Sequence, residues 1–526
     1  MFKILISDPL DKESLAVLKN NKHFSVTEDR KLDNLDKYDA WLVRSGTTVT
    51  AQHLAKTKNL RLVGRAGTGV DNIDIKEATK RGVLVINVAG ANAVAVAEHV
   101  FALMLAMVRK LIKADKLVKA GGWRSSELKG NELNEKKLGI LGFGKVGKIV
   151  AKIAASFNMK VLAFDPFINK GDFSMKNVEV CSLEDVLKSS DIITLHVPLT
   201  EKTRHLINSE NLALCKKGVL IINTSRGEII NEADLAKAIK EEKVAAAAMD
   251  VYENEPPLNS PLLGLEDRVV LTPHIAASTK ETQKRVSSEV VKNMIDYFER
   301  GIVRGGVNVP AGFEADTVNK LGSYLALAER LGSFLGQLAP GAWRELSCAV
   351  HEKFEGKEQN ILLNAAVMGL LRCSIGDKVN MVNASFMAKE SSLNAKSSLI
   401  EQRDEEHPLE EINLSISLKD SQTYSVSGGV IAGKEMLIVR IGKLFVDVVP
   451  EGTLLLLNNI DKPGMIGKVG SLLGKHKINI ADMRVGRKHV NEEALMVLTV
   501  DSCPMPSVLK ELKKISGITN AAMVNL

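Results

Sequence analysis

The sequence predicts an α/β protein with two doubly wound parallel sheets of the Rossmann or flavodoxin type, followed by an α+β segment and a ferredoxin-like βαββαβ unit. Over about the first 300 residues, short β-branched runs alternate with amphipathic helical stretches, as they do in parallel sheets joined by crossover helices. A glycine turn of the form G-x-G-x-x-G separates one such run from the helix that follows it. Segment 451–526 reads β, α, β, β, α, β.

Length and composition limit the class of protein. A chain of 526 residues holds three or four domains at about 150 residues each. Hydrophobic residues make up 45% and aromatic residues 4%, a globular composition with aliphatic cores that excludes collagen-like and wholly disordered proteins. Seventy basic and 63 acidic residues give a net charge of +7, and the chain has no arginine-rich arm or zinc spacing. We therefore expect no nucleic acid partner.

Cysteine usage and the N-terminus indicate a cytoplasmic protein. The cysteines are odd in number and far apart, which favours neither a disulfide framework nor a metal site. The opening sequence MFKILISDPL reads as a strand followed by an acid, and not as a signal peptide. The most apolar helix, 94–108, carries Glu98 and His99 and is too short to cross a bilayer, so we expect a buried core helix and no membrane partner.

The strand-like runs of the first part are too many for one compact sheet of this kind. Two α/β domains fit better, with a boundary near 94–110. Helical patterns lie between the runs, for example at 145–157 and 234–242. The expected strands are 2–7, 40–43, 60–65, 83–87, 137–141, 160–165, 191–197, 218–223, 245–251 and 268–272.

The chain changes character after a long helical pattern that begins beyond Thr279. This helix is expected to end at Arg300, because Gly301 suits the left-handed position that closes a helix. A further helix is expected at 318–337, and 345–450 read as mixed α+β with weak, partly polar strands. The elements expected in the last unit are 454–458 (β), 464–476 (α), 478–485 (β), 493–499 (β), 506–515 (α) and 521–524 (β).

The glycine turn predicts a dinucleotide site. Gly142 makes the tight turn, Gly144 lets the backbone approach a pyrophosphate, and Gly147 lets helix and strand pack closely. The helix N-terminus supplies amide donors and a positive dipole. The next strand ends in Asp165, whose carboxylate would accept ribose hydroxyls and repel a 2′-phosphate. The predicted cofactor is therefore NAD and not NADP.

Three polar side chains follow successive strand ends beside this turn. Arg226 follows run 218–223, Glu255 follows run 245–251, and His274 follows run 268–272. Arg226 offers a bidentate fork for a carboxylate, and His274 can exchange a proton with a reacting oxygen near neutral pH. Glu255 can orient the imidazole and raise its pKa. Since ligands bind beyond the carboxyl ends of parallel strands, we expect these three residues to form one catalytic site.

At this point the chain resembles the D-isomer-specific 2-hydroxyacid dehydrogenase family. The supporting motifs are GFGKVG with Asp165, NTSRGEIINEADL, MDVYENEPP and TPHIAAST. The runs VRSGT and GRAGTGVDNID narrow the resemblance to long members with a C-terminal ACT domain, which oxidise 3-phospho-D-glycerate to 3-phosphohydroxypyruvate in phosphorylated L-serine biosynthesis. The resemblance implies a substrate-binding domain of 1–98 plus 279–305, an NAD-binding domain of 99–278, an intervening regulatory domain of 306–450 and an ACT domain of 451–526.

The resemblance also assigns roles residue by residue. It makes Arg226, Glu255 and His274 the catalytic arginine, glutamate and histidine. A phosphorylated acid carries two anionic ends, so cations besides Arg226 must face it. The implied substrate contacts are Arg44, Ser45, Arg65 and Asn92, with Arg124 and Lys129 as weaker candidates supplied to a neighbouring subunit. Besides the glycines and Asp165, the implied cofactor contacts are Thr68, Lys145, Val146, Val197, Thr224, Ser225, Arg226, Asp250, His274 and Ala277.

The C-terminal unit resembles a small-molecule sensor. Its resemblance to an ACT domain implies that Asn459, Asp461 and Asn479 bind an amino acid, L-serine by analogy, and that the protein is a feedback-inhibited homotetramer. The alternative is a tetramer-forming unit without a ligand. In the intervening segment, Lys434, Arg440 and Lys443 form either an anion site or, more simply, a solvated basic face.

Two other functions remain open at this stage. One is a dehydrogenase of another D-2-hydroxy acid, such as glycerate, lactate or 2-hydroxyglutarate. The other is an NAD-sensing regulatory protein of the kind represented by the C-terminal-binding corepressors, which keep this fold. The complete catalytic trio and the ACT-like unit argue against the second.

Overall fold

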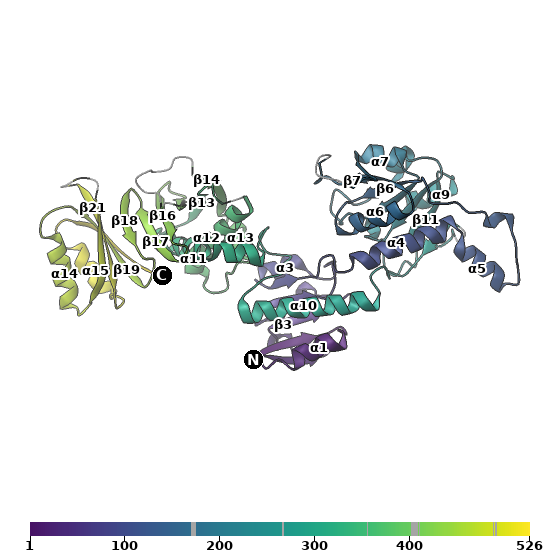
Figure 1. Cartoon of the computed structure of the whole chain (residues 1–526). Coiled ribbons are helices and arrows are strands. Elements are labelled where there is room, and N and C mark those ends of the chain that lie inside the picture. The colour runs from purple at the N-terminus through teal and green to yellow at the C-terminus, as the bar shows by residue number, and fades with distance from the viewer. Residues whose placement is uncertain are drawn as a thin grey trace.

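The computed structural model describes the whole chain except residues 170–174, 266–267, 355, 401–408, 410, 488 and 490–491. Figure 1 shows an elongated molecule in which the N-terminal sheet lies at the centre. A second α/β unit stands on one side of it, and two further units extend in a row on the other side. Among the described residues, none of the helices is both long enough and apolar enough to cross a membrane.

The first unit is a parallel sheet in the order β2-β1-β3-β4-β5. Its helix α10 comes from much later in the chain, and Val290 and Met294 of α10 share one core with Ile4 and Leu42. The segment after α10 also joins this sheet, because Val307 N donates to Val85 O. The elements are β1 (Phe2–Ile6), α1 (Lys12–Lys19), β2 (Phe24–Glu28), β3 (Ala40–Val43), α2 (Ala51–Ala55), β4 (Leu62–Arg65), α3 (Ile75–Lys80), β5 (Leu84–Ile86) and α10 (Lys280–Arg300).

The second unit is a parallel sheet in the order β12-β11-β10-β9-β6-β7-β8. The strand order reverses between β6 and β9, which is the switch point where open α/β sheets bind their ligands. The elements are β6 (Lys137–Leu141), α6 (Lys145–Ser156), β7 (Lys160–Phe164), β8 (Val178–Val180), α7 (Leu183–Ser189), β9 (Ile192–Leu195), α8 (Ser209–Leu214), β10 (Val219–Asn223), α9 (Glu232–Lys240), β11 (Val244–Met249) and β12 (Val269–Leu271).

Two long helices run between these units. Helix α4 (Ala93–Val108) is the buried core helix that the sequence predicts, and its Phe101 and Met104 pack against Leu138 and Val150 of the second unit. Helix α10 returns the chain to the first unit and ends at Gly301, whose φ of 68° is the predicted left-handed cap. The two α/β units are therefore joined by two passages of the chain, an arrangement that suits opening and closing about a hinge.

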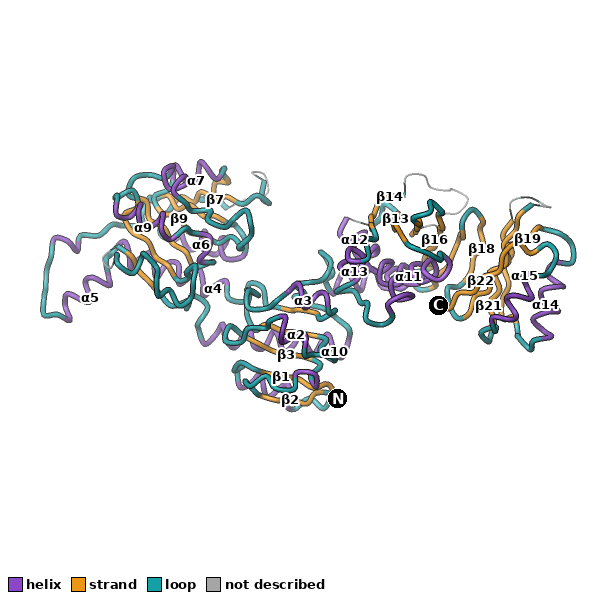
Figure 2. Tube along the Cα trace, turned by 180° about the vertical axis from the view of Figure 1, so that it is seen from behind, coloured by secondary structure: helices purple, strands orange, loops and turns teal. Residues whose placement is uncertain are grey.

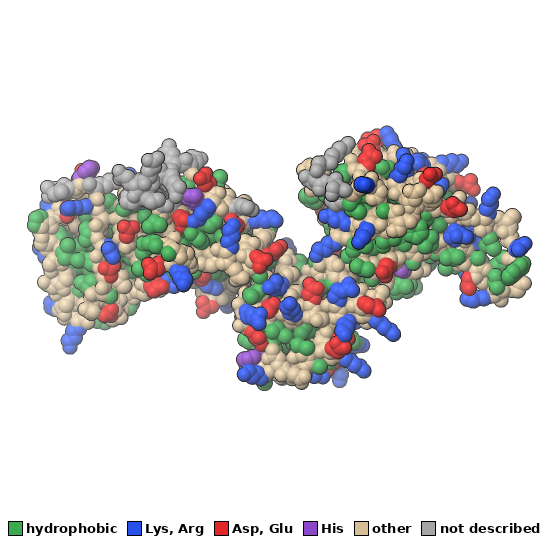
Figure 3. All heavy atoms as spheres, viewed as in Figure 1, with side chains coloured by type: hydrophobic (Ala, Val, Ile, Leu, Met, Phe, Trp, Pro, Cys, Tyr) green, Lys and Arg blue, Asp and Glu red, His purple; other side chains and the backbone are tan. Residues whose placement is uncertain are grey.

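A helical arm extends outward from the second unit. It begins with α5 (Leu111–Lys119), in which no residue is buried, and points away from the first sheet (Figure 1, Figure 2). The side chains of Leu111, Ile112, Val118 and Trp123 are exposed along it, and hydrophobic atoms are visible at its tip (Figure 3). Arg124 and Lys129 belong to this arm and are also exposed. The arm thus carries them away from the cleft of their own chain.

The third unit is a mixed sheet in the order β14-β13-β15-β16-β17-β18, backed by α11 and α12. It touches the first unit where Asn380 Nδ2 donates to Gly82 O, 2.9 Å away. Its elements are α11 (Ala315–Leu338), β13 (Trp343–Val350), α12 (Gly356–Ile375), α13 (Ala384–Glu390), β14 (Asn394–Leu399), β15 (Ile412–Leu418), β16 (Thr423–Ile431), β17 (Glu435–Ile441) and β18 (Leu444–Val448).

The last unit has the predicted βαββαβ order and an antiparallel sheet ordered β20-β21-β19-β22. Alternate leucines of β19 face opposite ways: Leu455 and Leu457 pack under the helices of this unit, whereas Leu454 and Leu456 share a core with α11. Burial of both sheet faces explains the unbroken leucine run. The elements are β19 (Thr453–Ile460), α14 (Met465–Lys475), β20 (Ile480–Arg487), β21 (Glu493–Val500), α15 (Pro506–Lys513) and β22 (Ile518–Asn525).

Candidate active site

The glycine turn between β6 and α6 has the shape that a dinucleotide site requires. Gly142 has a φ of +95°, and a Cβ there would lie 2.5 Å from the carbonyl oxygen of His196. A Cβ on Gly147 would lie 2.3 Å from the carbonyl oxygen of Gly142. A Cβ on Gly144, in contrast, would meet nothing within 4 Å. Gly142 and Gly147 are thus fixed by packing, whereas Gly144 faces open space at the uncapped N-terminus of α6, where a phosphate can approach the amides.

Asp165 lies beside this turn, directly after β7. Its two carboxylate oxygens accept hydrogen bonds from the backbone N–H groups of Phe143 and Phe167, at 2.9 and 3.0 Å. These bonds hold the carboxylate next to the turn and still leave lone pairs on both oxygens. The position fits an acid that accepts ribose hydroxyls, as the sequence predicts.

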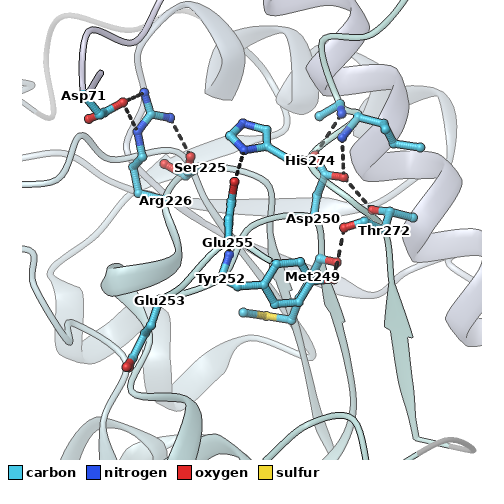
Figure 4. A network of polar contacts seen from close by, with 12 residues as sticks. Asp71, Ser225, Arg226, Met249, Asp250, Tyr252, Glu253, Glu255, Thr272 and His274 are labelled. Atoms are coloured by element: carbon cyan, nitrogen blue, oxygen red, sulfur yellow. Dashed lines mark hydrogen bonds and ion pairs between the residues drawn. The ribbon is translucent and has the colours of Figure 1, made fainter. Parts of the chain in front are cut away.

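His274 and Glu255 form an ion pair at the carboxyl end of the same sheet (Figure 4). His274 Nδ1 lies 2.8 Å from Glu255 Oε2, and Tyr252 N donates to the other carboxylate oxygen. The hydrogen bond to Glu255 raises the pKa of His274, against the opposing effect of burial. Burial is the largest single effect and acts to raise the pKa of Glu255, but the hydrogen bond and charge of His274 and the N–H of Tyr252 together outweigh it, so the net pKa is lowered. In the described part of the chain, Nε2 of His274 has no hydrogen-bond partner and is therefore available to a substrate oxygen.

Asp250 holds the backbone that carries His274. His274 has a φ of 54°, which a residue other than glycine seldom adopts. Its N–H donates to the carbonyl oxygen of Asp250, and the carboxylate of Asp250 accepts the N–H groups of Ile275 and Ala276, all at 2.8 Å. Asp250 is fully buried, and His99 of α4 lies 3.4 Å from its Oδ1. The buried carboxylate therefore fixes the His274 loop from within.

Arg226 follows β10 of the same sheet as His274 and reaches the first unit. Its Nε and Nη2 are each 2.9 Å from Asp71 Oδ2, and its Nη1 donates to the carbonyl oxygen of Ser225 (Figure 4). Arg65, at the end of β4, stands close enough to repel Arg226. Burial lowers the pKa of Arg65 first, and the charge of Arg226 lowers it further. Two guanidinium groups from different units thus converge here.

Several of the predicted cofactor residues line the loops between these groups. Thr224 is buried, and its Oγ1 has no hydrogen-bond partner in the described part of the chain. An unpartnered buried hydroxyl is a place that a bound ligand would satisfy. Ser225 Oγ donates to the carbonyl oxygen of Val197, 2.7 Å away, which ties the loop after β10 to the loop after β9. With the open turn at Gly144, these features fit a bound dinucleotide.

The predicted substrate residues of the first unit differ in how they face the cleft. Arg65 Nε donates to Asn72 Oδ1, and Thr68 Oγ1 donates to Asn92 Oδ1 at 2.9 Å, so these loops are tied together near Arg226. Arg44 instead donates from Nη1 to the carbonyl oxygen of Pro9, at 3.2 Å. Ser45 is exposed. Lys145, expected at the pyrophosphate, has its Nζ 2.9 Å from the carbonyl oxygen of Ala89 in the first unit.

The three predicted effector residues do not meet within one chain. Asn459 pairs with Ala494 across the sheet, and Arg487, which binds Asp461, pairs with the same residue. Asn479 precedes Ile480, which pairs with Val500 at the other end of the sheet. Six residues of strand, roughly 20 Å, separate these ends. Asp461 and Asn479 of one chain are therefore too far apart to bind the two ends of one amino acid, and their role as effector ligands stays a prediction.

The basic residues of the third unit are also dispersed. Lys434 and Lys443 lie at opposite ends of β17, and both are exposed, whereas Arg440 stacks over the ring of Phe445. These three residues therefore do not form a single anion site within the chain. In the described ranges, no group of His, Cys, Asp and Glu is arranged to hold a metal ion.

Sequence reasoning did not find Asp71, Asn72 or His99 as parts of the site. Asp71 and Asn72 belong to the run GTGVDN, whose resemblance to the family assigns neither of them a role. Asn72 Nδ2 donates to the carbonyl oxygens of Arg44 and Thr47 and so organises the first unit's loops. A signal was present for His99, because a histidine in an otherwise apolar helix needs a buried partner.

Comparison with known proteins agrees with this geometry. The model of the D-isomer specific 2-hydroxyacid dehydrogenase NAD binding domain matches residues 101–276. The D-3-phosphoglycerate dehydrogenase intervening domain matches 320–442, and the ACT domain matches 453–517.

Relatives match this chain over its full length. D-3-phosphoglycerate dehydrogenase of Archaeoglobus fulgidus is 38% identical over 532 residues, and that of Bacillus subtilis is 36% identical over 532 residues; both alignments cover 100% of each chain. Among solved structures, D-lactate dehydrogenase from Aquifex aeolicus, complexed with NAD and lactic acid, is 32% identical with a TM-score of 0.52. That alignment covers 57% of this chain and 96% of the other.

Proposed function

This chain belongs to the family of D-3-phosphoglycerate dehydrogenases, within the D-isomer specific 2-hydroxyacid dehydrogenases, and on that basis we propose that it oxidises 3-phospho-D-glycerate to 3-phosphohydroxypyruvate with NAD. This reaction is the first step of phosphorylated L-serine biosynthesis. The observation that carries the proposal is the His274–Glu255 pair, 2.8 Å apart, which faces Arg226 at the edge of the nucleotide sheet.

His274 acts as the general base in the oxidative direction. Its Nε2 takes the proton of the C2 hydroxyl while Nδ1 remains hydrogen-bonded to Glu255. The negative charge of Glu255 stabilises the imidazolium that forms. Arg226 binds the carboxylate next to C2 and orients that carbon. Bound NAD supplies the acceptor for the C2 hydride. The hydride thus leaves C2 for NAD and the proton leaves the oxygen for His274, and the product is a ketone.

Arg65 is the residue best placed to hold the second anionic end of the substrate. It lies at the end of β4, near Arg226, and is half-buried. A phosphate at this position would relieve the repulsion between the two guanidinium groups. D-lactate has no such group, so a preference for the phosphorylated acid is expected to depend on Arg65.

NAD is held by the turn at Gly144, by Asp165 and by the loops that carry Thr224 and Ser225. The support is the open N-terminus of α6, the carboxylate beside it and the unpartnered hydroxyl of Thr224. Asp250 instead faces inward and acts by holding the His274 loop.

The test compares NAD reduction with 3-phospho-D-glycerate, D-glycerate, D-lactate and D-2-hydroxyglutarate. We expect kcat/KM to be highest for the phosphorylated acid, and Arg65→Gln to remove most of that advantage. Lys19→Gln, which removes an exposed ion pair with Glu28 on the far edge of the first sheet, is the matched control. Equal rates with D-lactate would overturn the substrate assignment. Undiminished turnover by His274→Ala would overturn the mechanism, and no turnover of any of the four acids by wild type would favour a regulatory NAD-binding protein.

We further propose cytoplasmic location, assembly as a homotetramer and feedback inhibition by L-serine. Since Asn479 lies at the opposite end of the sheet from Asn459 and Asp461, one serine can contact all three only if two chains contribute. Light scattering measures the assembly. Calorimetric titration of the full chain with L-serine measures the binding, and lack of heat at millimolar serine would remove the regulatory part alone.

A further inference from the structure

A glycine loop of the first unit is packed between two arginines of the cleft. A Cβ on Gly67 would lie 2.0 Å from Nη1 of Arg65, and a Cβ on Gly69 would lie 2.0 Å from Nη2 of Arg226. The same position at residue 69 is 2.8 Å from Asp71 Oδ2. Both guanidinium groups therefore lie against bare backbone, and the carboxylate of Asp71 stands beside the Arg226 group.

We propose that Asp71 is a positioning residue for Arg226, and that it turns the guanidinium so that its two terminal nitrogens face the substrate carboxylate. The inference rests on the proposed function of Arg226. Asp71 Oδ2 binds Nε and Nη2, and the carbonyl oxygen of Ser225 takes one hydrogen of Nη1. A guanidinium carries five N–H donors, so one N–H on each terminal nitrogen is left for the substrate. That remaining pair matches the spacing of a carboxylate.

The charges around Arg226 show why it needs such a partner. Arg65 and Arg226 repel one another, and this repulsion helps to lower the pKa of Arg65 after the effect of burial, whereas the charge of Asp71 acts in the opposite direction. Without Asp71, Arg226 would turn away from Arg65 and from the substrate. Asp71 thus lets two cations converge on one dianionic ligand.

The contact also crosses the cleft. Asp71 follows β4 of the first unit, and Arg226 follows β10 of the second. The pair can form only when the two units approach one another. Arg226 is therefore correctly aimed only in the closed arrangement, which links substrate capture to closure.

An opposite role for Asp71 makes an opposite prediction. If Asp71 were a placeholder that occupies Arg226 until the substrate displaces it, removal of its charge would lower KM for the phosphorylated acid. If Asp71 positions Arg226, the same change raises KM. The sign of the change in KM separates the two roles.

The experiment measures NAD reduction by the full-length chain with 3-phospho-D-glycerate for wild type, Asp71→Asn and Asp71→Glu. Because the Asp71 side chain is 63% exposed, we expect a loss of about 3- to 5-fold in kcat/KM for Asp71→Asn, carried mainly by KM for the acid, with partial recovery in Asp71→Glu. KM for NAD should change less than about twofold, since the contact lies outside the nucleotide turn. Glu28→Gln, which breaks an exposed ion pair with Lys19, is the control and should match wild type.

A double-mutant cycle shows whether Asp71 acts through Arg226. In an Arg226→Gln background, Asp71→Asn should cause little further loss, because the interaction is already gone. An additive loss, an unchanged KM or a lowered KM for the acid would each refute the proposal. Failure of the proposed function is distinguishable: if wild type preferred an unphosphorylated D-2-hydroxy acid, the same cycle on that acid would still test Asp71.

Discussion

The bond between Glu255 and His274 makes a sharp prediction about pH. Glu255→Gln keeps the shape of the side chain and removes its charge. Because the hydrogen bond to Glu255 is the largest cause of the raised pKa of His274, that pKa must fall in the variant. The base form of His274 is neutral, so the acid limb of kcat/KM for oxidation should move to lower pH.

Glu255→Gln should also lower kcat/KM at high pH, and the size of this loss follows from how exposed His274 and Glu255 are. A hydrogen bond between charged groups contributes about 1.5–3 kcal/mol when it is shielded from water. His274 and Glu255 are 51% and 40% exposed, so solvent screening places the expected cost at the low end, about 1.5 kcal/mol. This corresponds to roughly a 10-fold lower rate on the plateau.

The assay is the initial rate of NAD reduction by Glu255→Gln at a series of pH values, beside wild type and Glu253→Gln. Glu253 lies two residues away and faces His205 instead of His274, at 3.3 Å, so its variant should keep the wild-type profile. An acid limb that stays in place in Glu255→Gln, or moves to higher pH, would refute the assigned roles of this pair.

Four further predictions follow from single contacts. Asp165→Ser should raise the use of NADP relative to NAD, measured as the ratio of kcat/KM; an unchanged ratio would contradict the ribose role. Gly147→Ala should weaken NAD binding and lower Tm, because its Cβ would lie 2.3 Å from a backbone oxygen and overpacking costs about 1–3 kcal/mol. His99→Phe should lower kcat and change KM less, because the loss of the His99 contact loosens Asp250 and the His274 loop; an unchanged kcat would refute this role of His99. Asn479→Ala should abolish the calorimetric signal of L-serine and leave turnover unchanged.

The alternating strands and helices of the first two units could be predicted because each one depends on the pattern of residues within a short segment. Strand runs 40–43 and 137–141 coincide with β3 and β6, and the helix that ends at Arg300 stops at the predicted glycine. The strands β2 and β8 were not predicted. β2 has the sequence FSVTE, in which only Phe24 is buried, and β8 is three residues long and not buried at all. Such edge strands form because a neighbouring strand is present, and the chain itself gives little sign of them.

The catalytic trio could be predicted because a parallel sheet brings its strand ends to one edge. Arg226, Glu255 and His274 each follow a strand, so their meeting depends on topology alone. Asp71 reaches Arg226 from another unit, and this contact depends on how two separately folded parts meet. The separation of the effector residues within one chain also depends on topology: Asp461 follows β19 and Asn479 precedes β20, and because these strands run in the same direction, the end of one is far from the start of the other.

The core that α11 shares with the last sheet has a mechanical consequence. Leu454 and Leu456 pack against the same helix that backs the third unit. We therefore expect the two C-terminal units to move together as one rigid body and not as flexibly linked domains. Their contacts with the first unit include Phe313, which packs against the cores of both, Val382, and the hydrogen bond from Asn380 Nδ2 to Gly82 O. Any movement that an effector causes in the last unit would therefore reach the first unit through these contacts, at the turn between α3 and β5.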